Sequence, residues 1–331
     1  MNVLVTGSTG FLGAALCHAL VQAGHNVRAF HRPTSTLKLL EDLPGIEHAL
    51  GDLTQPESIL PAMQDIEIVF HCAAQLDHRR QPSGRMYAVT VEGTRAVLKA
   101  AQRAGVRRVL HTSSVAALGL PENNTPAPMN EHHSWNCRPH LWPYGYTKHL
   151  AEMEVQRAVA EGMDVVILNP SYIIGPGDIY RQSSSLLIQV AQQRLRLTTE
   201  GGLNVVHLQD VIAGHLAAME RGQRGERYIL GGQNLQHTVL LQKIAQAAGV
   251  PAPNSLIPAG LLRSLSGPLS LLESFLDLPV SASLLRQAGL YFYYETRKAQ
   301  VGLRLPPPRP IEDAITQALD WFARMGALSV E

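Results

Sequence analysis

The sequence predicts an α/β fold in which a parallel sheet carries helices on both faces and is followed by a smaller, mainly helical lobe. Short β-branched runs alternate with amphipathic stretches through the first half of the chain. Runs such as Val3-Leu4-Val5 are apolar at every position, as strands buried on both faces are. A glycine-rich segment directly follows this first run and leads into a helical pattern.

The elements follow in order along the chain. Strands are expected at 2–6, 26–31, 46–50, 66–71, 108–112 and 164–168, and helices at 11–23, 56–63, 86–104 and 144–161. The regular alternation breaks after residue 169. Later strands are expected at 204–208 and 227–230, and the region from about 236 onward is mainly helical, with a terminal helix at 311–325.

Composition excludes several classes of protein. The chain has 331 residues, of which 45% are hydrophobic and 17% charged, so it is long enough for a large domain and a second lobe. A net charge of +1 without runs of like charge predicts no nucleic-acid partner. The three cysteines are widely spaced, which favours a reducing, cytoplasmic setting and no metal site. The apolar runs fall short of the length of about 20 residues that a membrane span needs.

The strongest local pattern is the run Thr6-Gly7-Ser8-Thr9-Gly10-Phe11-Leu12-Gly13. Gly7 permits a tight turn, Gly10 lets backbone amides approach a pyrophosphate, and Gly13 allows close packing of helix on sheet. The helix N-terminus then offers unpaired N–H groups to phosphates. Because this run joins a strand to a helix, it predicts the dinucleotide-binding turn of a Rossmann-type domain.

The end of the second strand bears on the choice between NAD and NADP. A carboxylate there would bind the ribose 2′-hydroxyl, but His31 and Arg32 stand in its place. Arg32 can bind a 2′-phosphate through two donors, with Ser35 and Lys38 in support. The alternative is that Arg32 and Lys38 are ordinary solvated cations of a surface loop. We therefore expect NADP(H) as the cofactor, and NAD(H) stays open.

Further residues are expected around the cofactor. Asp52 follows the third strand and either lies near the adenine or simply forms a turn or helix cap. The complete expected set is Gly7, Thr9, Gly10, Phe11, Leu12, Gly13, His31, Arg32, Ser35, Lys38, Asp52, Leu53, Cys72, Ala73, Ala74, Thr112, Tyr144, Lys148, Asn169, Pro170, Ser171 and Ile173.

A candidate catalytic pair lies in Pro143-Tyr144-Gly145-Tyr146-Thr147-Lys148. Tyr144 and Lys148 are four residues apart, so a helix places them on one face with about 6 Å between their Cβ atoms. The ammonium group, together with the positive nicotinamide ring of the oxidised cofactor, is expected to lower the phenol pKa from its free value of about 10. Tyr144 would then exchange a proton with a substrate oxygen. Ser114, at the end of the fifth strand, is expected to bind that oxygen, with Thr112 and Ser113 as alternatives.

These motifs together resemble the extended short-chain dehydrogenase/reductases. The runs TGSTGFLG, VFHCAA, TSS and PYGYTK carry the resemblance, and the later runs LNPS, GPGD, GGLNVVH and GERYILGG are similar to the dihydroflavonol 4-reductase-like branch. The resemblance implies an NAD(P)-binding Rossmann domain at 1–169, with 203–232 returning to it. It also implies a substrate-binding lobe at 170–202 and 233–331, a homodimer, catalytic roles for Ser114, Tyr144 and Lys148, and 2′-phosphate binding by Arg32 and Lys38.

Two positions depart from the family pattern. Thr90 stands where relatives usually carry Asn, which puts any proton-relay role of that amide in doubt. Gln209 stands where they usually carry Asp, and Asp210 is then expected to cap the following helix.

Substrate contacts are expected from 75–81, 135–142, 171–180 and the C-terminal lobe. Arg79 and Arg80 can meet an anionic nucleotide-sugar or simply face solvent, and Trp142, Tyr172 and Ile173 hint at an apolar pocket. Phe292, Tyr293 and Tyr294 are expected to pack the lobe.

Three functions therefore compete. The first is an NADP(H)-dependent oxidoreductase that interconverts a ketone or aldehyde and an alcohol. The second is an NAD-dependent nucleotide-sugar epimerase or dehydratase. The third is a non-catalytic NADP(H)-binding regulator, a class that commonly lacks the intact Tyr/Lys pair found here.

Overall fold

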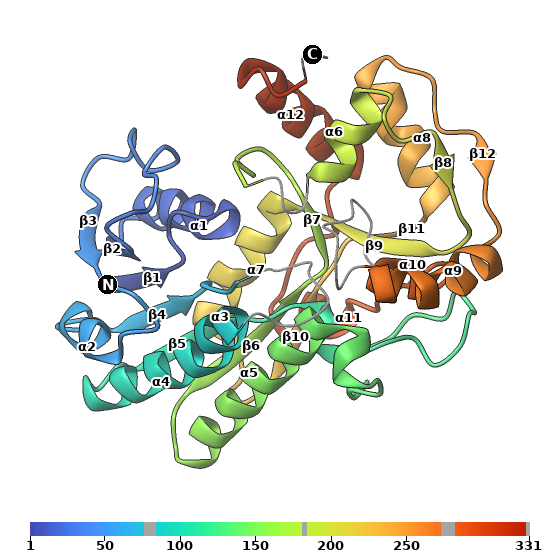
Figure 1. Cartoon of the computed structure of the whole chain (residues 1–331). Coiled ribbons are helices and arrows are strands. Elements are labelled where there is room, and N and C mark those ends of the chain that lie inside the picture. The colour runs from blue at the N-terminus through green and yellow to red at the C-terminus, as the bar shows by residue number, and fades with distance from the viewer. Residues whose placement is uncertain (76–83, 181–183, 273–281, 329–331) are drawn as a thin grey trace.

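The computed structural model describes residues 1–75, 84–180, 184–272 and 282–328, and a seven-stranded parallel sheet organises the N-terminal half (Figure 1). Its strand order is β3-β2-β1-β4-β5-β6-β10. The strands are β1 (Asn2–Thr6), β2 (Asn26–His31), β3 (Glu47–Leu50), β4 (Ile68–His71), β5 (Arg108–Thr112), β6 (Val165–Pro170) and β10 (Arg227–Leu230). The order runs outward from β1 in both directions, which is the doubly wound arrangement of a Rossmann-type fold, and it confirms the predicted fold class.

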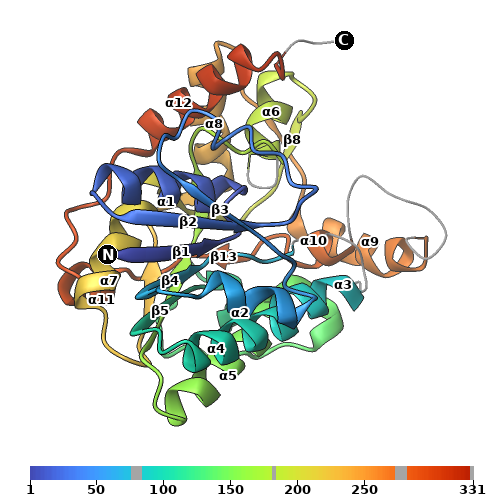
Figure 2. The same cartoon turned by 90° about the vertical axis from the view of Figure 1, so that its left-hand side faces the viewer.

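Helices cover both faces of this sheet. On one face lie α1 (Phe11–Gln22) and α7 (Leu208–Arg221), and on the other α2 (Ile59–Ala62), α4 (Gly93–Arg103) and α5 (Pro143–Ala160). Figure 2 shows α1 on one side of β1 and β2, with α2, α4 and α5 on the other. Val3 and Val5 pack in the core between the sheet and the helices α1 and α7. Leu4 packs in the core on the opposite face, against α2, α4 and α5, because successive side chains of a strand point to opposite faces. This two-sided burial explains the uninterrupted apolar runs.

The helix expected at 86–104 is divided into three pieces. They are α3 (Gly84–Tyr87), a π-helical segment (Ala88–Glu92) and α4. The Thr94 hydroxyl donates to the Thr90 carbonyl at 2.6 Å and so competes with the regular helical hydrogen bonds. The Thr90 hydroxyl accepts from the Gln75 backbone N–H at 3.2 Å, next to the end of β4. Thr90, which replaces the family Asn, therefore lies in a π-bulge, a feature common beside functional sites.

A second sheet stands beside the first. It contains β7 (Tyr172–Ile174), β9 (Gly202–His207), β11 (Gln233–Gln236) and β13 (Tyr291–Phe292), with β9 pairing to the other three. The helices α6 (Ser185–Ala191), α8 (His237–Ala248) and α12 (Ile311–Arg324) pack with this sheet around a core that includes Val205, Ile244 and Ile315.

The remaining elements are short or lie at the surface. They are the paired strands β8 (Leu197–Thr198) and β12 (Ser255–Leu256), and the helices α9 (Ala259–Leu272), α10 (Ala282–Arg286) and α11 (Arg297–Gly302). Phe292, Tyr293 and Tyr294 are buried, as expected. In the described part of the chain, no helix is both long and apolar enough to cross a membrane.

The segment 203–232 returns to the large sheet only in part. Its helix α7 and strand β10 pack on or within that sheet, but β9 belongs to the second sheet. This corrects the expectation that the whole segment rejoins the first domain. The strand expected at 204–208 is also displaced, because His207 already caps α7.

Candidate active site

The glycine run forms a turn too tight for larger residues. Gly7 has φ +69°, and a Cβ atom there would lie 2.8 Å from the Cα atom of Ala73. A Cβ atom on Gly13 would lie 2.1 Å from the Gly7 carbonyl oxygen. Gly10 is the N-cap of α1, has no side-chain capping bond, and is followed by a first turn without acidic residues. This uncapped helix end fits an anionic phosphate, and it lies between β1 and β4, where the strand order reverses.

The residues around the turn are anchored to the sheet. Thr9 is buried, and Phe11 and Leu12 pack against the core beneath α1. Ser8, which sequence reasoning did not single out, donates its hydroxyl to the Phe30 carbonyl at 3.1 Å. This bond ties the turn to β2, and its signal in the sequence is only a small polar residue inside the glycine run.

The end of β2 presents two cations to solvent. Arg32 and Lys38 are exposed, and the Ser35 N–H donates to the Arg32 carbonyl in a turn. The segment from Arg32 to Lys38 is not helical. The His31 ring is engaged, with Nδ1 3.0 Å from the Arg32 carbonyl oxygen and Nε2 3.0 Å from His48 Nδ1.

Asp52 forms a turn with its own neighbours. One carboxylate oxygen accepts both the backbone N–H and the hydroxyl of Thr54, each at 2.9 Å. Burial acts to raise the pKa of Asp52, but these bonds and the charges of Arg32 and Arg85 hold it below its usual value. The carboxylate therefore acts as the turn former that sequence reasoning allowed, and an adenine contact stays a prediction.

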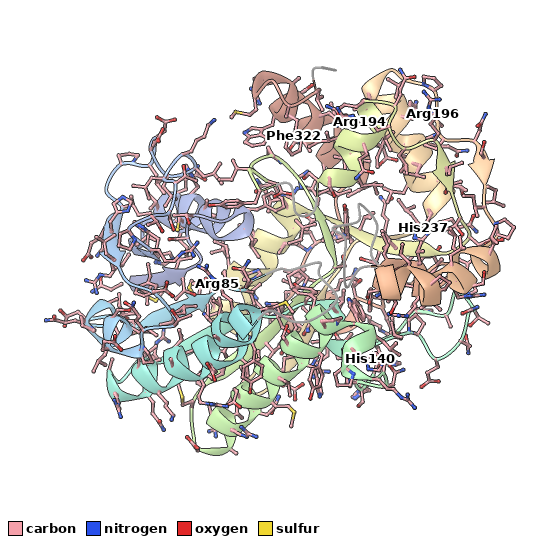
Figure 3. The ribbon with its side chains drawn as sticks, in the orientation of Figure 1. Arg85, His140, Arg194, Arg196, His237 and Phe322 are labelled. Atoms are coloured by element: carbon pink, nitrogen blue, oxygen red, sulfur yellow. The ribbon has the colours of Figure 1, made fainter. Side chains whose placement is uncertain are left out.

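Arg85 was missed by sequence reasoning. It comes from α3, and it lies close enough to act on Asp52 from beyond the end of β3. Figure 3 shows Arg85 next to the large sheet, whereas Arg194 and Arg196 lie across the molecule near α6 and β8. No sequence pattern marks Arg85. Arg79 and Arg80, which were expected to meet an anionic nucleotide-sugar or to face solvent, lie in 76–83, outside the described part of the chain.

The segment after β4 is fixed by a buried histidine. His71 Nδ1 lies 2.7 Å from the Thr6 hydroxyl, and His71 Nε2 lies 2.9 Å from the Thr94 hydroxyl. The Thr94 hydroxyl hydrogen is used on the Thr90 carbonyl, so Nε2 must donate and Nδ1 must accept. Burial, with the charge of Lys148, lowers the pKa of His71 to about 3 and keeps it neutral. The backbone N–H of Ala73 reaches the Thr6 oxygen at 3.4 Å, which draws the end of β4 to the glycine turn.

The other predicted residues of this region differ in exposure. Leu53 is buried, Cys72 and Ala73 are half-buried, and Ala74 is exposed. Burial raises the pKa of the Cys72 thiol to about 11, and its sulfur lies 3.2 Å from the Thr112 hydroxyl.

Lys148 is buried on α5, next to the end of β5. Its Nζ donates to the Thr112 carbonyl at 3.0 Å, and only 3% of the residue is exposed. Burial lowers the pKa of Lys148 to about 8, against the opposing influence of Cys72 and Glu152. Lys148 is therefore mostly charged at neutral pH, and it releases its proton far more readily than a surface lysine does.

Three hydroxyls end β5, and the structure separates their partners. The Thr112 hydroxyl contacts Cys72 and His215, and the Ser113 hydroxyl donates to Glu152 at 2.5 Å. The Ser114 hydroxyl accepts the Ala116 N–H at 3.2 Å and hydrogen bonds with Tyr144. This arrangement favours Ser114 over the two alternatives as the group beside the tyrosine, and its role stays a prediction.

In the protein without cofactor, the pKa of Tyr144 lies above its free value. Burial raises it above the free value, and the hydrogen bond with Ser114 offsets only part of that rise. The Lys148 ammonium is itself desolvated and directed at the Thr112 carbonyl, so in the protein alone it does not overcome the burial of the phenol. Tyr144 is therefore protonated at neutral pH.

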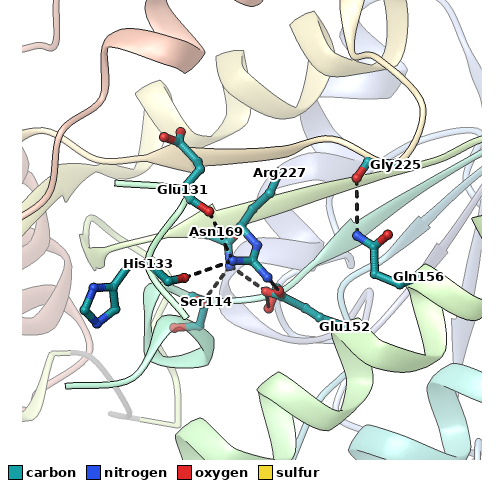
Figure 4. Close-up of polar contacts among 9 residues, drawn as sticks. Ser114, Glu131, His133, Glu152, Gln156, Asn169, Gly225 and Arg227 are labelled. Atoms are coloured by element: carbon teal, nitrogen blue, oxygen red, sulfur yellow. Dashed lines mark hydrogen bonds and ion pairs between the residues drawn. The ribbon is translucent and has the colours of Figure 1, made fainter. Parts of the chain in front are cut away.

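A buried carboxylate, Glu152, extends this site. It follows Lys148 by four residues, so Tyr144, Lys148 and Glu152 share one face of α5. The Asn169 side chain donates to Glu152 at 2.7 Å and to the Ser114 carbonyl at 2.8 Å, as Figure 4 shows. The amide of Asn169, predicted to contact the cofactor, is thus used within the protein. Sequence reasoning missed Glu152, although its spacing repeats that of the catalytic pair.

Aromatic and apolar side chains cluster around the N-terminal end of α5, where Trp142 is the N-cap. Trp142 and Phe292 are in edge contact with ring centroids 5.5 Å apart, and they pack with Leu118 and Leu290. Trp135 stacks on His149 at 5.6 Å. Of the remaining predicted residues, Pro170 ends β6, Ser171 is buried, and Tyr172 and Ile173 are half-buried in β7.

The cap of α7 differs from the expected one. The His207 ring, not Asp210, accepts the N–H of Gln209, at 3.0 Å. Asp210 instead binds the backbone and side chain of Arg309. A histidine at the end of β9 therefore replaces the acidic cap. Among the described residues, no group of three or more His, Cys, Asp or Glu side chains could hold a metal ion.

Comparison with known proteins places this site in a family. The NAD dependent epimerase/dehydratase family matches residues 3–231. The chain is 38% identical to sterol demethylase protein B of Methylococcus capsulatus over 270 residues, or 80% of each chain. It is 30% identical to dihydroflavonol 4-reductase of Zea mays over 71% of each chain.

Solved structures agree with this placement. The crystal structure of gox2253 superposes with a TM-score of 0.87 at 34% identity, covering 99% of both chains. A nucleoside-diphosphate-sugar epimerase from Pseudomonas aeruginosa superposes with a TM-score of 0.83 at 25% identity, again over 99% of both chains. The fold, the glycine turn and these similarities lead to one conclusion: the chain belongs to the NAD-dependent epimerase/dehydratase family.

Proposed function

We propose that this protein is an NADP(H)-dependent oxidoreductase that interconverts a ketone or aldehyde and an alcohol, with Tyr144 as the acid/base. The observation that carries the proposal is the arrangement of Ser114, Tyr144 and Lys148 at the ends of β5 and α5. A hydroxyl, a phenol and a buried ammonium on one side of the glycine turn are the groups that proton exchange beside a hydride carrier requires.

The protonation states favour carbonyl reduction. Tyr144 holds its proton at neutral pH and can donate it to a carbonyl oxygen that Ser114 also binds. When bound, the nicotinamide cofactor supplies or accepts the hydride. Lys148 remains charged below about pH 8, where it favours the phenolate left after proton transfer.

The preference for NADP(H) rests on charge at the end of β2. Arg32 and Lys38 are exposed there, and no carboxylate ends that strand. Arg85 adds a third cation on the far side of Asp52. A 2′-phosphate would gain charge-assisted hydrogen bonds from these side chains.

The substrate that fits best is a lipophilic ketone. Trp142, Phe292, Leu118 and Leu290 pack in one apolar cluster, and Trp142 is the N-cap of α5, the helix that carries Tyr144. The second sheet with its C-terminal helices would form the substrate-binding lobe. Relatives with names of this kind include a 2-alkyl-3-oxoalkanoate reductase and a farnesyl-dihydroquinoline-oxide ketoreductase, each 31% identical to the chain. A homodimeric assembly and a cytoplasmic location stay predictions.

Two measurements test the proposal. Calorimetric titration of cofactor-stripped protein should give tighter binding of NADPH than of NADH. NADPH oxidation with a panel of alkyl ketones should then reveal turnover, and Tyr144→Phe should lower kcat by about 10³-fold while NADPH binding survives. Undiminished activity of Tyr144→Phe would overturn the assignment.

The second candidate is a nucleotide-sugar epimerase or dehydratase. It is favoured by the 25% identity and full-length overlap with the Pseudomonas aeruginosa epimerase. Tightly retained NAD, or a preference for NADH together with turnover of a nucleotide-sugar, would favour this candidate over the reductase.

A further inference from the structure

The Glu152 carboxylate is buried and serves three different segments. It belongs to α5 and is 2% exposed. One oxygen accepts the Ser113 hydroxyl at 2.5 Å and the Asn169 amide at 2.7 Å, and the other lies 2.5 Å from an Arg227 nitrogen. These partners come from β5, β6 and β10, three neighbouring strands of the large sheet.

Glu152, Ser113, Asn169 and Arg227 together form a polar network. Asn169 extends this network to Ser114, and Arg227 extends it to the loop before α5. A second Arg227 nitrogen donates to the carbonyls of Glu131 and His133, at 3.3 and 3.5 Å (Figure 4). The second Asn169 bond goes to the Ser114 carbonyl. The carboxylate therefore connects the helix that carries the catalytic pair with the backbone of the expected substrate-binding serine.

Stability alone does not explain a buried ion pair of this kind. Removing two charges from water is costly, and well-packed apolar residues of similar volume are often as stabilising or more so. The network does supply direction, because a carboxylate only accepts hydrogen bonds and so fixes the orientation of every donor around it.

We propose that Glu152, held by Arg227, is a positioning residue that orients α5 and Ser114 and stabilises the charged form of Lys148. This inference rests on the function proposed above for Tyr144 and Lys148. Glu152 stands one turn beyond Lys148, and its charge opposes the fall in the pKa of Lys148 that burial causes. Without that charge, Lys148 should lose its proton at lower pH, and the Tyr144 phenolate should be harder to form.

The substitution Glu152→Gln tests the network selectively. The amide oxygen can still accept from Ser113 and Asn169, but the amide nitrogen would face the Arg227 guanidinium, so two donors would meet. We expect kcat for NADPH-dependent ketone reduction to fall about 10- to 100-fold, as misplacement of reacting groups does, with KM for NADPH nearly unchanged. The decline of kcat at high pH should also begin at lower pH than in the unchanged protein.

A matched control lies on the same helix. Glu154 is also largely buried and is paired with Arg95 and Arg157, but it lies away from β5. Glu154→Gln should keep kcat within about twofold and leave the pH profile in place, since it removes a paired carboxylate of the same helix without touching the network; its arginine partners are more exposed than Arg227. Equal losses of kcat in both variants, or an unshifted profile in Glu152→Gln, would overturn the proposal.

A double variant guards against misfolding. In Glu152→Gln with Arg227→Met the opposed donors are gone, so the protein should fold even where the single variant does not. It should regain part of the kcat lost by Glu152→Gln but keep the shifted pH profile, because the negative charge is still missing. A double variant with the pH profile of the unchanged protein would contradict a role of the Glu152 charge.

One readout is independent of turnover. The Lys148 ammonium can be titrated by NMR of the lysine side chains, and the spectrum of Lys148→Met identifies its signal. Glu152→Gln should move this titration from about pH 8 to lower pH, and Glu154→Gln should not. If no ketone is reduced but the shift is present, the proposed function fails while the positioning role stands; an absent shift rejects the positioning role whatever the substrate.

Discussion

Acid should destabilise this protein through two histidines that burial keeps neutral. Burial lowers the pKa of His71 to about 3 and that of His215 to about 4, from an ordinary value near 6.5. The His215 ring is fixed between the Val211 carbonyl, 2.8 Å from Nδ1, and the Thr112 hydroxyl, 2.9 Å from Nε2. Both rings are buried, so a charged imidazolium would lack the water that solvates it in the unfolded chain.

The sign of the effect follows from which state takes up protons. As the pH falls below about 6.5, the unfolded chain protonates both histidines, while the folded protein does so only near pH 3 to 4. The stability contributed by the two neutral rings is therefore complete above pH 6.5 and is lost as the pH decreases. At about pH 5 each histidine lowers the free energy of unfolding by about 2 kcal/mol, or about 4 kcal/mol for the pair. That is a large part of a typical total of about 5–15 kcal/mol.

Urea unfolding followed by tryptophan fluorescence measures this loss. The free energy of unfolding should be compared at about pH 7.5 and about pH 5 for the unchanged protein and for His215→Gln, whose amide cannot titrate. We expect the difference between the two pH values to shrink by about 2 kcal/mol in the variant. An equal loss in both proteins would refute the assignment of a neutral, buried His215.

Three further predictions concern the cofactor and the rate. Gly13→Ala would place a Cβ atom 2.1 Å from the Gly7 carbonyl oxygen, so calorimetry should show binding of both NADPH and NADH weakened at least about tenfold, whereas Gly260→Ala, at an open helical position, should leave it intact. Arg32→Ala should weaken NADPH binding by about tenfold and NADH binding little, since only the 2′-phosphate loses a charge-assisted bond; equal losses would place Arg32 elsewhere. The rate of ketone reduction should decline as the pH rises through about 8, where Lys148 loses its proton, and a flat profile to pH 10 would contradict that value.

Local signals explain what the sequence predicts well. The first strands are recognisable because burial on both faces demands apolar residues at every position, as in β1. The glycine turn is recognisable because Gly7 and Gly13 have no room for a side chain. The candidate pair Tyr144 and Lys148 is recognisable because a spacing of four is a property of the helix itself. Each of these features depends on a few consecutive residues.

Tertiary features were not predictable in the same way. The second sheet pairs β9 with β13, whose residues Tyr291 and Phe292 show no strand periodicity of their own. Glu152 looks like a surface residue of a helix until Arg227, far along the chain, is placed against it. The raised pKa of Tyr144 in the protein without cofactor depends on burial, which its spacing from Lys148 does not reveal.

The path of the chain between its two sheets constrains how such proteins can diversify. The backbone passes from β6 directly into β7, from β9 into α7, and from β10 within a few residues into β11. Segments of the large sheet and of the second sheet therefore alternate along the chain, so neither sheet can be exchanged between relatives as one contiguous segment. A chimera that imports a new substrate lobe would have to import β10 and its Arg227 as well, or rebuild the partner of Glu152. New substrate specificity should thus arise more easily from changes in the loops between these strands and helices than from recombination of whole domains.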